Sequence, residues 1–174
     1  MSESQKKLVF RIAHQCKDLS FGKLMSVYAE SNSENGQEFW PEESSHRQIA
    51  LAEQEFYSYL RQVFFKTDGA FYAVLEQDGQ YVSVLRMEPY RDGLLLEALE
   101  TAPEQRRKGY AADLVRNVLE HTGNTKIYSH VGKRNLASLR THESCGFRIV
   151  SDFAVYADGS VNQRCFTLCV DRNS

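Results

Sequence analysis

The chain has 174 residues, a net charge of −2 at pH 7, 42% hydrophobic residues and 25% charged residues. This length and balance are typical of a single globular domain, here residues 1–174, with a full apolar core. A slightly acidic chain excludes a broad nucleic-acid-binding surface, and no apolar run approaches the length of a membrane span. We therefore expect neither a nucleic-acid partner nor a membrane-embedded segment.

The cysteine content and the N-terminal residues indicate the cellular compartment of the protein. The four cysteines have neither the spacing of a metal site nor the density of a disulfide-rich domain. The stretch from Met1 to Lys7 lacks the apolar region of a signal peptide. Together these features predict a reduced, cytoplasmic protein with no metal site.

The N-terminal part of the chain predicts one strand and two helices. Residues 8–13 alternate as a strand does, and residues 18–31 have apolar side chains at helical spacing. The polar stretch 32–43 contains Gly36, Trp40 and Pro41 and indicates a loop. Ser44 or Ser45 is expected to cap a long second helix that ends near residue 66.

From residue 70 onward the pattern changes from helical to strand-like spacing. Asp78-Gly79 and Asp158-Gly159 are hairpin signals, and Gly146 is placed to end a helix in a left-handed conformation. The expected elements are strands at 70–76, 80–88 and 94–101, a helix from about 110 to 123, a strand at 127–131, a helix at 136–145, and strands at 147–156 and 161–171. The whole order is β-α-α-β-β-β-α-β-α-β-β, which predicts an α/β (α+β) mixed sheet with helices on both faces, parallel in the middle and antiparallel at the edges.

The junction between the strand 94–101 and the helix that follows it carries a second kind of information. A proline ends the strand, and the run Arg106-Arg107-Lys108-Gly109 then leads directly into the helix. Backbone amides of such a turn converge with the unpaired amides of a helix N-terminus, and this arrangement holds phosphate. The alternative is that the three cations form only a solvated charge run.

The residues that surround this junction resemble the GNAT N-acetyltransferase superfamily. The segment Arg106–Ala111 fits the pattern Gln/Arg-x-x-Gly-x-Gly/Ala, and Thr101-Ala102-Pro103 matches the approach to it. Asn135 followed by a helix ending in Gly146-Phe147 matches a second signature. The resemblance runs from about Leu8 to Val170. It implies a GNAT-like fold, whose central sheet is mostly antiparallel with one splayed parallel pair, residues 94–101 and 127–131.

The resemblance also implies acetyl-CoA as the donor and a primary amine as the acceptor, on a small molecule, a lysine side chain or a protein N-terminus. The pantetheine arm would enter the gap between the splayed strands, and Asn135 and Ser138 would contact the far side of the cofactor. The main chain of Leu99, Glu100 and Thr101 would lie beside pantetheine, and the diphosphate would be held by Arg106, Arg107, Lys108, Gly109, Tyr110, Ala111 and Ala112.

Acetyl transfer requires a base, because an alkylammonium with a pKa of about 10.4 has no lone pair at pH 7. Glu97 lies in an otherwise apolar strand, one alternation before Leu99, and is the candidate base. Its alternative role is a structural ion pair with Arg86 on the neighbouring strand. Glu100 is expected to point to the opposite face, towards solvent or a helix.

The proton donor to the leaving sulfur is the point where the chain departs from the resemblance. The family commonly has a tyrosine five residues before the phenylalanine of the Gly-Phe pair, and this chain has His142 there. Asn135, Ser138 and His142 share one helix face. We take His142 as the candidate acid, with a structural helix histidine as the alternative. A thiol–imidazole pair of His142 with Cys145 is disfavoured, because nothing else in the chain supplies an acyl-enzyme site.

The acceptor site would be shaped by residues 32–43 and the last hairpin. Trp40, Tyr128 and His130 are the candidate substrate-binding residues, and a core position is the alternative for His130. Acidic residues near Trp40 would attract a cationic amine. A non-catalytic acyl-CoA-binding regulatory module is the alternative function, and a homodimer is possible. A nucleotide-binding protein of another fold is disfavoured, because the turn lacks Gly-x-Gly-x-x-Gly and a Lys-Ser/Thr ending.

Overall fold

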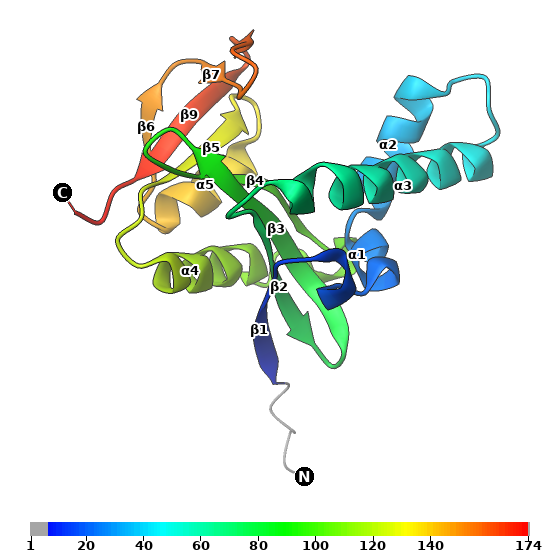
Figure 1. The fold of residues 1–174 in the computed structure, drawn as a ribbon, viewed down its shortest axis with the longest axis horizontal. Helices are drawn as coiled ribbons and strands as arrows, with labels where there is room; N and C mark the ends of the chain where they lie inside the picture. Colours follow the sequence, from blue (N-terminus) through cyan, green and yellow to red (C-terminus); the bar gives the residue numbers. More distant parts are fainter. Residues whose placement is uncertain (1–6, 174) are drawn as a thin grey trace.

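The computed structural model describes residues 7–173, which fold around one large mixed sheet (Figure 1). Short 3-10 turns at Cys16–Asp18, Phe64–Lys66 and Pro103–Gln105 connect some of the elements. The helices and strands are β1 (Leu8–Ala13), α1 (Phe21–Val27), α2 (Ala29–Phe39), α3 (Ser45–Gln62), β2 (Phe71–Gln77), β3 (Gln80–Tyr90), β4 (Gly93–Thr101), α4 (Tyr110–Thr122), β5 (Ile127–Gly132), α5 (Leu136–Ser144), β6 (Arg148–Ser151), β7 (Ala154–Val155), β8 (Val161–Asn162) and β9 (Cys165–Val170).

The sheet confirms the predicted fold class. Seven strands follow the order β1-β2-β3-β4-β5-β9-β6, and every neighbouring pair is antiparallel except β4 and β5. The parallel pair is joined through α4, as a crossover connection requires. Strands β7 and β8 form a separate two-stranded ribbon.

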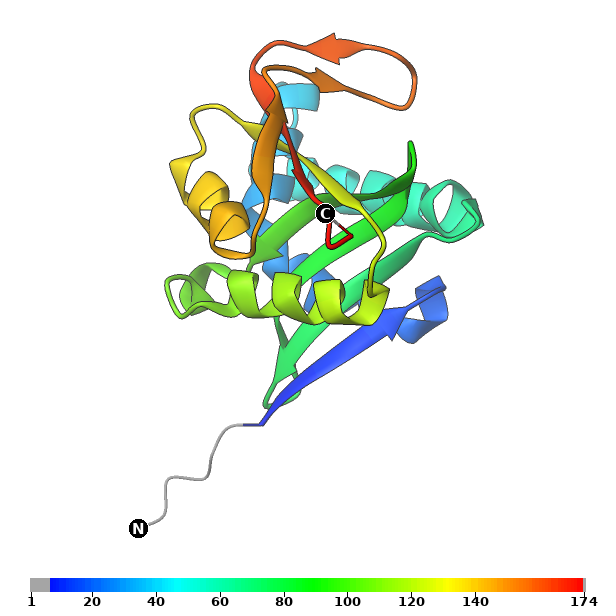
Figure 2. The same ribbon diagram turned by 90° about the vertical axis from the view of Figure 1, so that its left-hand side faces the viewer.

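Helices cover the two faces of the sheet and enclose two apolar clusters (Figure 2). On one face, α4 buries a stripe of four side chains against the strands: Leu114, Val115, Val118 and Leu119. On the other face, α1 and α3 pack against Tyr72, Val74 and Val84. Burial of apolar surface on both faces stabilises the central strands, whose residues are buried in near-continuous runs.

The prediction of a loop over residues 32–43 is wrong, because residues 29–39 form the helix α2. Gly36 lies so close to α3 that a Cβ there would be 2.8 Å from the carbonyl carbon of Gln48. The Gln48 side chain donates a hydrogen bond to the carbonyl of Trp40, 3.0 Å away. The glycine that indicated a loop is therefore a helix–helix contact point, and tertiary packing outweighs local propensity here.

Two other expected elements are divided in the structure. The helix predicted over residues 18–31 consists of α1 and the start of α2, with a break at Tyr28. The hydroxyl of Tyr28 donates to the carbonyl of Ala98 at 2.7 Å, which fixes this break against β4. The long strands predicted at 147–156 and 161–171 are each interrupted. The turn at Asp158-Gly159 is present, with Gly159 at a φ of 83°.

Candidate active site

The parallel strands β4 and β5 separate part-way along their length, as the family resemblance implied. Their last paired residues are Leu96 and Ser129, and the Ser129 hydroxyl donates to the Leu96 carbonyl at 3.2 Å. Beyond this point β4 is paired only with β3, and β5 is paired only with β9. The edge of β4 that faces β5 therefore has no partner strand in the described part of the chain, and its backbone groups are available to a ligand.

A β-bulge at Ala98 lies next to the point where the strands separate. Ala98 has a φ of 49°, and the register with β3 shifts between Val84–Glu100 and Arg86–Glu97. A left-handed alanine costs on the order of 1 kcal/mol and marks a site that the surroundings over-determine. The bulge also corrects the predicted alternation, because Leu99 packs with the α4 side of the sheet while Glu97 faces the α3 side.

The turn between β4 and α4 has the features of an anion site. Arg107 and Gly109 have left-handed backbones, with φ of 64° and 85°, and no side chain caps the N-terminus of α4. A Cβ added to Gly109 would meet no atom within 4 Å, so this position opens onto free space. Amides at such a turn and helix N-terminus suit the diphosphate of coenzyme A.

The cations of the turn are not equivalent. Arg106 forms an ion pair with Glu30 at 2.7 Å, and its Nε donates to the Thr101 carbonyl at 3.4 Å. Lys108 donates to the Gln105 side chain at 2.8 Å. Within residues 7–173, Arg107 has no such partner and is the cation most free to meet an anion.

Side chains at the end of β4 are held away from the gap. The Glu100 carboxylate accepts a hydrogen bond from Ser31 of α2, and burial raises its pKa. The prediction that Glu100 and Glu97 point to opposite faces is wrong, because the bulge at Ala98 turns Glu100 to the same side of the sheet as Glu97. The Thr101 hydroxyl contacts that of Ser83, 3.1 Å away. These contacts leave the main chain of residues 99–101 as the surface that β4 presents to the gap.

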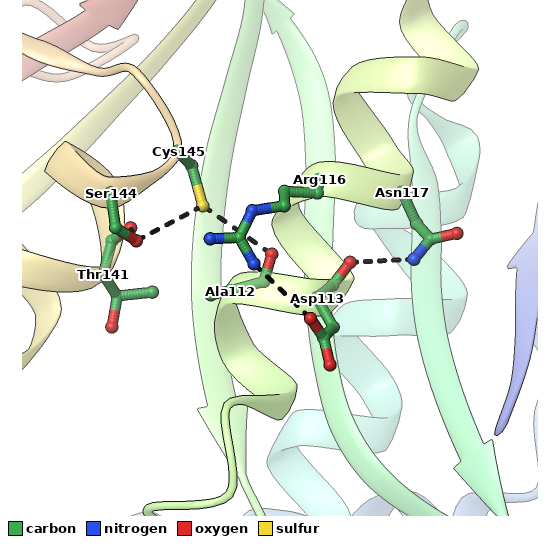
Figure 3. A network of polar contacts seen from close by, with 7 residues as sticks. All are labelled: Ala112, Asp113, Arg116, Asn117, Thr141, Ser144 and Cys145. Carbon is green, nitrogen blue, oxygen red and sulfur yellow. Dashed lines mark hydrogen bonds and ion pairs between the residues drawn. The ribbon is translucent and has the colours of Figure 1, made fainter.

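Contacts between α4 and α5 fix the first turns of α4 (Figure 3). The Cys145 thiol points to the carbonyl of Ala112 at 3.6 Å, and the Asn117 side chain donates to the carbonyl of Asp113 at 2.8 Å. Arg116 forms an ion pair with Asp113 at 3.4 Å. Burial raises the pKa of Cys145, so its thiol is a packing group rather than a nucleophile. The Tyr110 hydroxyl donates to Gln77 at 2.7 Å and ties α4 to β2.

The predicted stripe on α5 has a largely structural arrangement. Asn135 caps the helix by accepting a hydrogen bond from the Ser138 amide at 3.1 Å. The His142 side chain is 1% exposed, packs against Phe147, and its Nδ1 lies 2.8 Å from the Ser138 carbonyl. Since a carbonyl only accepts, the proton is on Nδ1, and the buried Nε2 has no hydrogen-bond partner among residues 7–173. Burial lowers the pKa of His142, so this geometry favours the structural alternative over the acid.

Two carboxylates lie on the α3 side of β3 and β4. Glu97 forms an ion pair with Arg86 at 3.4 Å, which is the alternative that the sequence left open. Glu88 lies close to Glu97, and burial together with the hydrogen bond and charge of Glu97 raises the pKa of Glu88 to about 7. The two groups form a pair that holds one proton near neutral pH.

The predicted acceptor residues fall into two places. Tyr90 packs edge-on against both Tyr128 and His130, with ring centroids 5.4 Å apart in each pair. Tyr156 also packs edge-on against His130, and both ring nitrogens of His130 are buried without a hydrogen-bond partner in the described part of the chain. His130 follows Ser129, so it stands where β5 leaves β4. Trp40 lies elsewhere, at the end of α2.

A match with a family model decides the affiliation. Residues 24–147 match the model of the acetyltransferase (GNAT) family, which is most of the chain. The chain belongs to the GNAT family. The match includes the separated strands, the glycine turn, α4 and α5, so the features described above are those of a GNAT acetyltransferase fold.

Solved structures of other GNAT proteins share this fold over nearly the whole chain. Spermidine N-acetyltransferase from Vibrio cholerae, solved with CoA and spermine, is 20% identical, with a TM-score of 0.60 over 95% of this chain and 96% of that one. The IAA acetyltransferase from Bacillus cereus is 19% identical, with a TM-score of 0.60 over 95% and 99%. The ribosomal-protein-S18-alanine N-acetyltransferase from Escherichia coli is 16% identical, with a TM-score of 0.59 over 95% and 94%. A search of curated protein sequences finds no match.

Sequence reasoning missed one ionisable residue of this GNAT site, Glu88. Its neighbour Pro89 and the turn at 91–93 gave no reason to single it out. The usable signal was Arg86, because two residues further along the strand an acidic side chain returns to the same face. Among residues 7–173, no group of three or more histidine, cysteine or acidic side chains is placed to bind a metal, and no helix is long and apolar enough to cross a membrane.

Proposed function

We propose that this GNAT protein is an acetyl-CoA-dependent N-acetyltransferase that transfers the acetyl group directly to a primary amine of a small molecule or peptide. One observation supports the proposal: the opening between β4 and β5 is followed along the chain by the left-handed turn at the start of α4, and Glu97 comes directly after Leu96, the last residue of β4 that pairs with β5. Relatives of the same fold carry names that describe acetylation of spermidine and of a ribosomal-protein alanine.

The backbone groups of the gap fit coenzyme A by hydrogen-bonding capacity. The amides at the start of α4 and the side chain of Arg107 would hold the diphosphate, and the free edge of β4 at residues 99–101 would pair with the pantetheine amides. When bound, acetyl-CoA supplies an activated thioester. The open position at Gly109 supports this assignment, since a side chain there would occupy the space of the phosphate oxygens.

The carboxylate pair would prepare the acceptor. The amine must lose a proton before it can form the new C–N bond, and a carboxylate with a pKa near 7 is a suitable acceptor for that proton at neutral pH. In the proposed arrangement Glu88 takes the proton, directly or through water. Arg86 forms an ion pair with Glu97, and the charge of Glu97 raises the pKa and therefore the basicity of Glu88.

Steady-state release of free thiol from acetyl-CoA, measured with a panel of amines, tests the proposal. We expect amine-dependent turnover and a stoichiometric acetylated amine in the product. Binding of acetyl-CoA without turnover of any amine would instead indicate the regulatory acyl-CoA-binding module. Calorimetry with coenzyme A tests whether the protein binds the cofactor, as both the enzyme and the regulatory module must. The absence of binding would contradict the assignment of the gap to coenzyme A.

A further inference from the structure

A surface groove with a volume of about 410 Å³ lies between α2 and α3. Its walls are mainly aromatic: Phe39 and Trp40 come from the end of α2, and Phe56 and Tyr59 come from α3. The only carboxylate among its lining residues is Glu55, which is exposed. Asn32 and Asn35 are its other polar lining residues. A volume of this size, with aromatic walls and a small number of polar groups, is that of a small-molecule site.

The packing of the two helices keeps the groove in place. The helices touch closely where Gly36 meets Gln48, and the Gln48 side chain holds the Trp40 carbonyl at 3.0 Å. Ala52, a small buried residue, lines the groove and leaves space above it. Phe39 is 62% exposed although it is a large apolar side chain, so it has little role in the core of the protein.

Tyr59 connects one end of the groove to the carboxylate pair, which does not itself line the groove. The guanidinium carbon of Arg86 lies 5.1 Å from the centroid of the Tyr59 ring, and Arg86 is the ion-pair partner of Glu97. Burial raises the pKa of Tyr59, and the charges of Glu88 and Glu97 raise it further. The phenol at this end is therefore neutral and close to both carboxylates.

A second route connects the groove to the β4 bulge. The Phe56 ring packs edge-on against Tyr28, with centroids 5.3 Å apart, and the Tyr28 hydroxyl binds the Ala98 carbonyl at 2.7 Å. Tyr28 thus links the wall of the groove to the place where the strands begin to separate. A molecule lying in the groove would have one end next to Tyr59 and the other at the surface near Phe39.

We propose that this groove binds the body of the acceptor, and that the substrate class is a primary amine carried on an aromatic or other compact apolar group. The proposal rests on the proposed function and specifies its acceptor. Four aromatic side chains provide stacking and apolar contact along the groove, and the carboxylates beyond Tyr59 suit a single ammonium group. A polyamine would need carboxylates along its length, and the lining offers only Glu55.

Trp40 provides a direct test, because it is the only tryptophan of the chain and lines the groove. Its fluorescence, excited where only indole absorbs, is followed while 2-phenylethylamine or spermidine is titrated into the full chain. We expect a saturable change with 2-phenylethylamine and a much weaker one with spermidine. In Phe39→Ala the affinity for 2-phenylethylamine should fall about fivefold, since one aromatic wall is lost. Tyr57→Ala is the matched control, an exposed aromatic residue on α3 outside the groove, and it should bind as the wild type does.

Turnover measured on the same variants separates this proposal from the proposed function. Phe39→Ala should raise KM for 2-phenylethylamine with little change in kcat. Three results would overturn the groove assignment and leave N-acetyl transfer standing. They are turnover of amines without a change in Trp40 fluorescence, an affinity for spermidine equal to that for 2-phenylethylamine, and unchanged binding of 2-phenylethylamine in Phe39→Ala. Saturable, Phe39-dependent binding without turnover would support the groove and count against the catalytic proposal.

Discussion

Among single residues, Glu88 and Glu97 decide at which pH the site can act. Glu88 has a pKa of about 7, because it is partly buried and lies beside another carboxylate. Below that pH it is protonated and cannot accept a proton from the amine. We expect kcat/KM to rise with pH through about 7, and Glu88→Gln to remove this rise and to lower the rate by about 10²–10⁴-fold.

The control for this profile is Glu76→Gln, which removes a strand glutamate paired with Arg11, on β2. It should keep the wild-type profile. In Glu97→Gln the limb should move to lower pH, because the neighbouring charge that raises the pKa of Glu88 is gone. A Glu88→Gln variant that retained the limb near pH 7 would assign the base to another group.

His142 is tested by a pair of substitutions. The Nδ1 proton is held by the Ser138 carbonyl, and burial lowers the pKa of the ring, so we expect His142→Phe and His142→Tyr to turn over within a few-fold of each other. An acid role predicts a different outcome, a loss of about 10²-fold or more in His142→Phe that His142→Tyr restores. Turnover of both variants from pH 6 to 9 distinguishes the two roles.

Whether the role of a residue could be predicted depends on whether its environment is set by its neighbours in the sequence or by residues on other elements. The glycine turn and Gly146 are local, and their backbone requirements are visible in the sequence. The register of Glu88 and Glu97 is continuous with the turn at 91–93, and the ion pair of Glu97 with Arg86 was one of the alternatives that the sequence offered. Alanine has no sequence preference for a bulge, so the bulge at Ala98, which changes the faces of Leu99 and Glu100, could not be read in advance.

At the scale of elements, the N-terminus of α4 carries the cofactor assignment. Gly109 has a φ of 85° and opens onto free space, so Gly109→Ala introduces both a strained backbone and a methyl group in the proposed diphosphate position. We expect coenzyme A to bind on the order of tenfold more weakly by calorimetry. Gly159→Ala is matched, with a φ of 83° and equally open space in the hairpin turn, and it should leave the affinity unchanged. Equal affinities in the two variants would indicate that the diphosphate does not bind at this turn.

The contact between α2 and α3 is tested by another glycine pair. A Cβ at Gly36 would lie 2.8 Å from backbone atoms of Gln48, whereas a Cβ at Gly22 in α1 would meet nothing within 4 Å. Gly36→Ala should lower the free energy of unfolding by about 1–3 kcal/mol, and Gly22→Ala should raise it by up to about 1 kcal/mol. Urea unfolding of both variants measures the difference. A neutral Gly36→Ala would mean that the helices can separate without cost.

Elements with a strong local pattern were predictable, and those fixed by packing were not. The strands around Asp78-Gly79 and the helix α4 have turn residues and a regular apolar stripe, and the structure confirms both. The helix α2 has polar residues on most of its surface and a glycine at its contact point. Its stability comes from α3, which no local pattern reveals.

For the molecule as a whole, the buried ionisable groups of the site make stability depend on pH in two opposite directions. His130 and His142 have pKa values lowered by burial, so their contribution is present above the unfolded value of about 6.5 and is lost as the pH falls. Glu88 has a raised pKa, so the folded state binds its proton more tightly than the unfolded state does. Its contribution is present below about pH 4.5 and is lost as the pH rises through about 7.

The comparison of wild type with Glu88→Gln isolates the second effect, because the histidines are common to both chains. The free energy of unfolding, measured by urea at intervals from pH 5 to 8, should fall for the wild type relative to Glu88→Gln as the pH rises, and the difference should level off above pH 8. The ionised form of Glu88, which the proposed chemistry requires, is thus the form that the folded state disfavours. A difference that stayed constant across this range would show that Glu88 titrates at an ordinary pKa and would remove the physical basis for its role as the base.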